Sequence, residues 1–145
     1  MKKLGLITLL ITILFCFNGI AKAQSIEDLV EMCRVVAGDA SYIRDFKAQL
    51  DEGNPAPIKN QPFILARNTE YVFSICSSRE LEGELIIELF DTSRLVTTNY
   101  SISTSKYYDR ITFKCSTSGP YRLKMYFKDG KAGSAVVMLS MLKRV

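Results

Sequence analysis

The segment Tyr121-Arg122-Leu123-Lys124-Met125-Tyr126-Phe127-Lys128-Asp129-Gly130 alternates between apolar and mostly charged side chains and then closes on Asp-Gly. Successive side chains of a β-strand point to opposite faces, so this pattern is typical of a strand that buries one face. The buried face is expected to carry Tyr121, Leu123, Met125 and Phe127. Asp-Gly tolerates positive φ at both positions and therefore predicts a hairpin turn after the strand.

Alternation with the same period extends from Pro62 to the C-terminal end of the chain. The short alternating runs are separated by turn residues and recur about every 8 to 12 residues, which is typical of a β-sandwich. We therefore expect a mainly β fold, a single antiparallel β-sandwich of about eight strands over 41–145. Residues 41–50 fit both a helix and a strand, and we favour the strand.

A different period marks the region that precedes the sandwich. Ser25 can cap a helix, and the acidic residues that follow it suit the positive end of the helix dipole. Apolar residues then recur every three or four positions until Gly38, a residue type that commonly ends helices. We expect a short amphipathic α-helix over 26–37, within an N-terminal region of 24–40.

The beginning of the chain has the features of a secretory signal peptide. Two lysines follow the first methionine, residues 4–17 carry no charge, and Ala21 and Ala23 form a small-residue cleavage site. The uncharged run is shorter than the roughly 20 residues that span a bilayer. We predict cleavage after Ala23, removal of 1–23, and a periplasmic or secreted bacterial protein that keeps no stable membrane span.

Removal of that segment changes the charge balance. Lys2, Lys3 and Lys22 leave with it, so 16 Lys and Arg remain against 15 Asp and Glu. A net charge this small gives no electrostatic reason to expect nucleic acid as a partner.

Three cysteines remain after the predicted cleavage, namely Cys33, Cys76 and Cys115. An oxidising compartment permits one bridge among them and leaves one thiol. The spacing does not say which two would pair, and all three also fit the interpretation of small buried apolar side chains.

The residues that common catalytic sites need are absent from the sequence. The chain contains no histidine, which excludes Ser-His-Asp and Cys-His catalysis and most zinc sites. It has no phosphate-binding loop and no dinucleotide fingerprint, and its aspartates do not cluster as calcium ligands would. We predict no enzyme activity, no cofactor and no metal, and rank a small hydrolase with an unrecognised site last.

Three motifs in the strand-forming region carry a resemblance to a known family. They are Thr69-Glu70-Tyr71-Val72-Phe73, Ile87-Glu88-Leu89-Phe90-Asp91 and Ser118-Gly119-Pro120-Tyr121-Arg122-Leu123. Together they resemble the bacterial pre-peptidase C-terminal (PPC) domain over roughly residues 44–142. The resemblance implies a secreted β-sandwich of the jelly-roll type. Members of that family usually accompany a secreted enzyme, and Phe90 stands here where they usually have tyrosine.

Two sets of surface residues are candidates for binding. The polar segment 99–110 places three tyrosines and an arginine together, and tyrosine rings suit a sugar or an extended peptide. These candidates are Tyr100, Tyr107, Tyr108 and Arg110. The second set is a basic, partly aromatic stripe on the polar face of the strand predicted from residue 121 onward. The simpler interpretation of these residues is that they protect a sheet edge from pairing with another chain. The stripe comprises Arg122, Lys124, Tyr126 and Lys128.

The sequence therefore favours a non-enzymatic, exported binding or accessory module of the bacterial cell envelope that contacts a protein partner. The alternative is a glycan-binding module that uses the tyrosine-rich segment 99–110.

Overall fold

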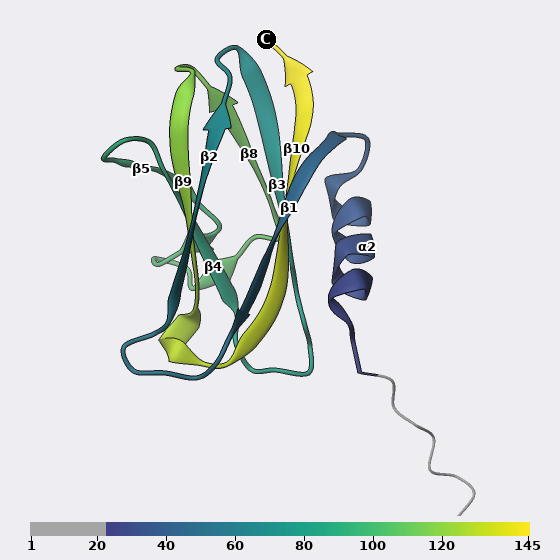
Figure 1. Ribbon diagram of the computed structural model, residues 1–145, viewed down its shortest axis with the longest axis vertical. Coiled ribbons are helices and arrows are strands. Elements are labelled where there is room, and N and C mark those ends of the chain that lie inside the picture. The colour runs from purple at the N-terminus through teal and green to yellow at the C-terminus, as the bar shows by residue number, and fades with distance from the viewer. Residues whose placement is uncertain (1–22) are drawn as a thin grey trace, which may run out of the picture.

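The computed structural model describes residues 23–145, so the predicted signal segment lies outside the described residues except for Ala23. Within this range one helix precedes a β-sandwich, as the sequence predicts. Figure 1 shows the two facing sheets of the sandwich with the helix α2 (Ile26–Ala37) beside one of them.

The sandwich consists of two four-stranded antiparallel sheets. The first sheet has the strand order β1 (Ser41–Leu50), β10 (Gly133–Arg144), β3 (Thr69–Ser77) and β8 (Arg110–Cys115). The second has the order β2 (Ile58–Leu65), β9 (Gly119–Phe127), β4 (Leu85–Phe90) and β5 (Leu95–Thr98). Only the connection from β4 to β5 joins two main strands of the same sheet. This arrangement is a jelly roll, so the predicted fold class is confirmed.

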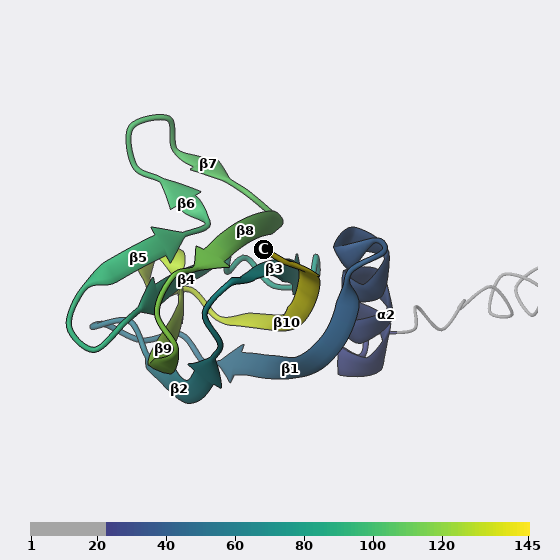
Figure 2. The ribbon, with the colours of Figure 1, turned by 90° about the horizontal axis from the view of Figure 1, so that it is seen from above.

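A third, minor pair consists of β6 (Tyr100–Ser101) and β7 (Lys106–Tyr107). In Figure 2 the loop between these two short strands projects away from the sandwich at the upper left, whereas α2 lies at the right. Segment 99–110 is therefore a small protruding hairpin rather than an irregular loop.

The hydrophobic core lies between the two sheets. The alternating segment of β9 supplies four core residues, as predicted. Tyr121, Leu123, Met125 and Phe127 are all buried in it. From the facing sheet, Phe73 and Val137 reach the same core. Strand β1 contributes Phe46 and Ala48 at alternate positions, which confirms the strand that we favoured for residues 41–50.

Helix α2 covers the outer face of the first sheet, over β3 and β10. It begins with a capping box, in which Ser25 and Asp28 each bond to the backbone of the other, and it ends at Gly38 with φ +67°. Leu29, Cys33 and Ala37 face the sheet and are buried there. The predicted helix of residues 26–37 is confirmed at both ends.

Two details of the strand prediction are wrong. Asp129 and Gly130 do adopt positive φ, but they lie in the one-turn helix η2 (Lys128–Gly130), and β9 and β10 belong to different sheets. The Gly53 N–H donates to the Gly130 carbonyl at 2.9 Å, which fixes this turn against the β1–β2 connection instead of a hairpin partner.

The second error concerns β2, which begins before Pro62. Pro62 lies inside the strand opposite Arg122. The strand interior tolerates proline here because β2 is an edge strand and has a partner strand on one side only.

Among residues 23–145, none of the helical segments is both long enough and apolar enough to cross a bilayer.

Candidate functional site

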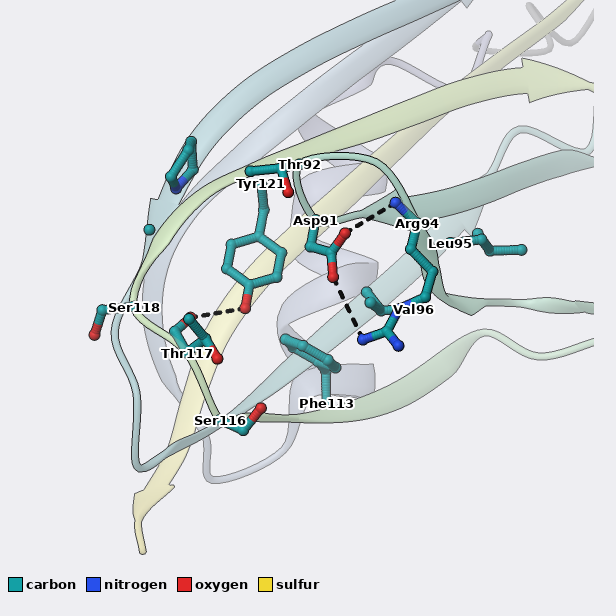
Figure 3. Close-up of a pocket in the computed structure, with 12 residues that line it drawn as sticks. Asp91, Thr92, Arg94, Leu95, Val96, Phe113, Ser116, Thr117, Ser118 and Tyr121 are labelled. Carbon is teal, nitrogen blue, oxygen red and sulfur yellow. Dashed lines mark hydrogen bonds and ion pairs between the residues drawn. The ribbon is translucent and has the colours of Figure 1, made fainter.

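A concave feature, here named the end cleft, opens where the edge strands β5 and β8 of the two sheets diverge. Its volume is about 490 Å³. Figure 3 shows it between the β4–β5 turn and the β8–β9 turn. The side chains that define it are Asp91, Arg94, Val96, Phe113, Thr117 and Tyr121.

The β8–β9 turn, residues 116–118, is exposed but held at several points. The Tyr121 hydroxyl donates to the Thr117 carbonyl at 2.8 Å, and the Ser118 hydroxyl accepts from the Arg67 N–H at 2.7 Å. One residue earlier, the Cys115 carbonyl accepts from the Asn68 N–H at 2.8 Å. Ser116, Thr117 and Ser118 therefore present exposed side chains from a turn whose backbone is fixed.

The β4–β5 turn on the other side of the cleft is organised by Asp91. Its carboxylate accepts from the N–H groups of Arg94 at 2.9 Å and Ser93 at 3.2 Å, and pairs with the Arg94 guanidinium at 3.6 Å. These backbone N–H groups, that of Arg94 foremost, hold the pKa of Asp91 below its usual value. The turn thus presents a carboxylate that stays ionised and a mostly exposed arginine.

The four candidate residues of segment 99–110 do not form one group in the structure. Tyr100 and Tyr107 lie opposite each other on β6 and β7, with ring centroids 4.7 Å apart. Tyr108 is more exposed, and its ring contacts Lys106 at 5.2 Å. Arg110 lies at the start of β8 with its side chain in solvent. Only Tyr107 and Tyr108 border a common depression, of about 290 Å³, together with Glu84, Asn99 and Asp109.

The basic stripe lies on the outer face of the second sheet. Strand β9 is flanked by β2 and β4, so the stripe is central and the edge-protection interpretation is wrong. Arg122 lies 4.5 Å from the ring of Phe90 and donates to Asn60 at 2.7 Å. Lys124 pairs with Glu88 at 3.2 Å, which neutralises part of the positive charge.

The two predicted groups meet at Lys128. This residue lies in η2, not on the strand, and its amine is 5.8 Å from the ring centroid of Tyr100. Next to it, the Tyr126 hydroxyl donates to Glu88 at 3.0 Å. Burial, with this hydrogen bond, raises the pKa of Tyr126 to about 12. Aromatic and basic side chains therefore form one continuous surface from the hairpin to the second sheet.

The cysteines occupy two different layers of the molecule. Cys33 and Cys76 are buried between α2 and the first sheet, whereas Cys115 is buried in the core between the sheets. All three are free thiols in the structure. In residues 23–145, no three Cys, Asp or Glu side chains converge as a metal site would require.

The end cleft was not predicted from the sequence. Its walls come from residues 91–96, 113 and 116–121, and only the fold brings these segments together. The signal available in the sequence was the turn composition of residues 116–120, which are Ser-Thr-Ser-Gly-Pro.

Comparison with known proteins identifies a fold but no sequence family. No family model matches the chain, and no curated protein matches it. Among solved structures, it is similar to Aeromonas hydrophila PliG, a periplasmic lysozyme inhibitor of g-type lysozyme. The TM-score is 0.52 at 10% identity, and the match covers 70% of this chain and 87% of that protein. At this identity the likeness establishes a shared fold.

Proposed function

We propose that this chain is a non-catalytic, exported protein-binding module, and that the rim of the end cleft is its binding edge. The observation that carries the proposal is the β8–β9 turn, which is exposed at Ser116, Thr117 and Ser118 yet fixed by hydrogen bonds from Tyr121 and Arg67. A loop that is already ordered loses little conformational entropy when it binds. Such loops on a rigid sandwich suit insertion into a concave partner surface.

The chemistry of the rim supports a protein partner. The two turns offer hydroxyl groups, an ionised carboxylate and an exposed arginine around a partly apolar wall that includes Phe113. A mixed polar rim around a small apolar centre is the usual composition of a protein interface.

The fold supports a candidate for that partner. PliG, which has the same fold, is a periplasmic lysozyme inhibitor. We therefore propose a lysozyme, and g-type lysozyme first, as the partner of this chain in the periplasm or outside the cell. The resemblance to PPC domains stays a separate prediction about the family of this domain.

The first experiment is a peptidoglycan lysis assay with purified g-type lysozyme and lysozymes of other types. We expect the chain to slow lysis by at least one type at a molar ratio near one. Thr117→Arg should lose the effect because it places a long charged side chain on the proposed binding turn. Thr104→Arg is the matched control, since Thr104 is an exposed threonine of the β6–β7 hairpin. Equal inhibition by both variants would show that the binding edge is elsewhere.

A glycan-binding function is the second candidate, and one observation favours it. The depression beside Tyr107 and Tyr108 combines aromatic rings with the polar groups of Glu84, Asn99 and Asp109. Sugars bind to sites of this composition. If this candidate is right, Tyr107→Ala should weaken binding of soluble peptidoglycan fragments, whereas Tyr42→Ala, at an exposed tyrosine of β1, should not.

A further inference from the structure

The contact between α2 and the first sheet contains two cysteines. Leu29, Cys33 and Ala37 of the helix are buried against a cluster that includes Cys76 and Val136. Cys33 is 0% exposed and Cys76 is 4% exposed. The helix therefore covers a pair of thiols that belong to segments far apart in the sequence.

The position of the Cys33 thiol places it beside Cys76. Its sulfur lies 3.4 Å from the Val136 carbonyl and 3.6 Å from the Ser74 carbonyl. Val136 is the residue paired with Cys76 across β3 and β10, and Ser74 precedes Cys76 by two positions on the same face of β3. The proximity of the two thiols shifts their pKa values, raising that of Cys33 and lowering that of Cys76.

Cys115 cannot join this pair. It lies opposite Thr69 at the other end of β3, seven residues from Cys76, which corresponds to about 23 Å along a strand. It also faces the core between the sheets, where its sulfur lies 3.2 Å from the Thr117 carbonyl and 3.5 Å from the Tyr121 hydroxyl. A disulfide requires Cα atoms within about 7 Å.

We propose that Cys33 and Cys76 form a disulfide that covalently fixes α2 to β3, while Cys115 remains a thiol. The oxidant is an external disulfide, either a small molecule or a thiol-oxidising protein. One cysteine thiolate attacks it to form a mixed disulfide and releases one thiol. The second cysteine thiolate then attacks the mixed disulfide and releases the second thiol. The two protons lost by the cysteines end on the two released thiols.

Burial of the pair decides when these steps take place. Because both thiols are covered in the folded protein, the external disulfide reacts while α2 is still undocked during folding. Docking of α2 onto the first sheet then brings the second thiol to the mixed disulfide.

The test is a peptide map of the full chain, refolded from the reduced state with a mixture of reduced and oxidised glutathione. After alkylation of free thiols, trypsin places the four cysteines of the full chain in separate peptides, and those that contain Cys33, Cys76 and Cys115 end at Arg34, Arg79 and Arg122. We expect the peptides ending at Arg34 and Arg79 to be linked, and the peptide ending at Arg122 to be alkylated. Alkylation of all three, or a bridge that includes Cys115, would overturn the proposal. This result does not depend on export or on the proposed partner.

A thermal measurement checks that the bridge holds the helix. The bridge closes the chain between Cys33 and Cys76 into a loop, and this should raise the melting temperature by about 10 °C. We expect a reductant to remove that increment from the wild type and from Cys115→Ala, but to leave Cys76→Ala unchanged. A wild-type melting temperature that does not respond to reductant, in protein shown to be reduced, would also contradict the proposal.

Discussion

The side chain of Asn99, which follows the last residue of β5, forms hydrogen bonds with the backbone of β4 in the second sheet. Its side-chain oxygen accepts from the Ile87 N–H at 2.8 Å, and its amide donates to the Leu85 carbonyl at 3.0 Å. The side chain thus replaces a strand backbone as the partner of β4, and it is buried. The β6–β7 hairpin begins at the next residue, so Asn99 also positions Tyr100.

We expect Asn99→Ala to lower the free energy of unfolding by about 2 to 4 kcal/mol, because it leaves a buried N–H and a buried carbonyl without partners. Asn60→Ala is the matched control, since Asn60 is exposed and its side chain accepts a hydrogen bond from Arg122. Urea denaturation measures both. A loss below about 0.5 kcal/mol for Asn99→Ala would mean that water replaces the side chain easily.

Tyr126 gives the stability a dependence on alkaline pH. Its pKa is raised to about 12 by burial and by the bond to Glu88, so the folded state binds the phenol proton more strongly than the unfolded state does. The contribution is complete below about pH 10 and is lost as the pH rises from about 10 to 12.

Urea midpoints measured between about pH 8 and 11 should therefore fall less for Tyr126→Phe than for the wild type. Tyr108→Phe should follow the wild type because Tyr108 is exposed. Identical alkaline losses in all three proteins would refute the role of Tyr126.

At the scale of elements, the connection from β9 to β10 has no room for a side chain at Gly133. A Cβ on Gly133 would lie 2.2 to 2.5 Å from three ring atoms of Phe127, a side chain that is itself fully buried. At Gly38, which ends α2, a Cβ would meet no atom within 4 Å, and only the positive φ opposes a side chain.

Gly133→Ala should therefore cost about 2 to 3 kcal/mol, as overpacking of a core does, whereas Gly38→Ala should cost about 1 kcal/mol from backbone strain. Chemical denaturation of the two variants separates these causes. The reverse order would mean that Phe127 can move aside.

The elements also show which parts of the fold the sequence predicts. Local patterns were sufficient for α2, because its cap at Ser25 and its end at Gly38 are both adjacent to the apolar period. They were sufficient for β9 because its two faces differ sharply. They failed at Asp129-Gly130, since the turn chemistry fixes φ but not the sheet to which the next strand belongs.

At the scale of the whole molecule, the candidate site was less predictable than the fold. The sequence placed Lys128 and Tyr100 in separate candidate groups, and their contact depends on η2 turning toward the hairpin. The end cleft arises where the edges of two sheets separate, a feature that no single segment encodes. Both the contact between Lys128 and Tyr100 and the end cleft depend on how segments distant in the sequence pair in the sheets.

The end cleft and the helix occupy different parts of the molecule. Helix α2 packs on β3 and β10, whereas the end cleft is lined by residues of the β4–β5 turn, the β8–β9 turn and their flanking strands. A partner that binds the end cleft therefore need not displace the helix. Reduction of the Cys33–Cys76 pair should change thermal stability without a comparable change in partner affinity.

The most direct test of a protein-binding edge at the end cleft is a calorimetric titration of g-type lysozyme with the wild type, Thr117→Arg and Thr104→Arg. We predict saturable binding near one-to-one for the wild type and Thr104→Arg. For Thr117→Arg we predict an affinity lower by at least about 100-fold, a loss typical of a central interface position. No binding by the wild type, or equal affinity for the two variants, would contradict the account.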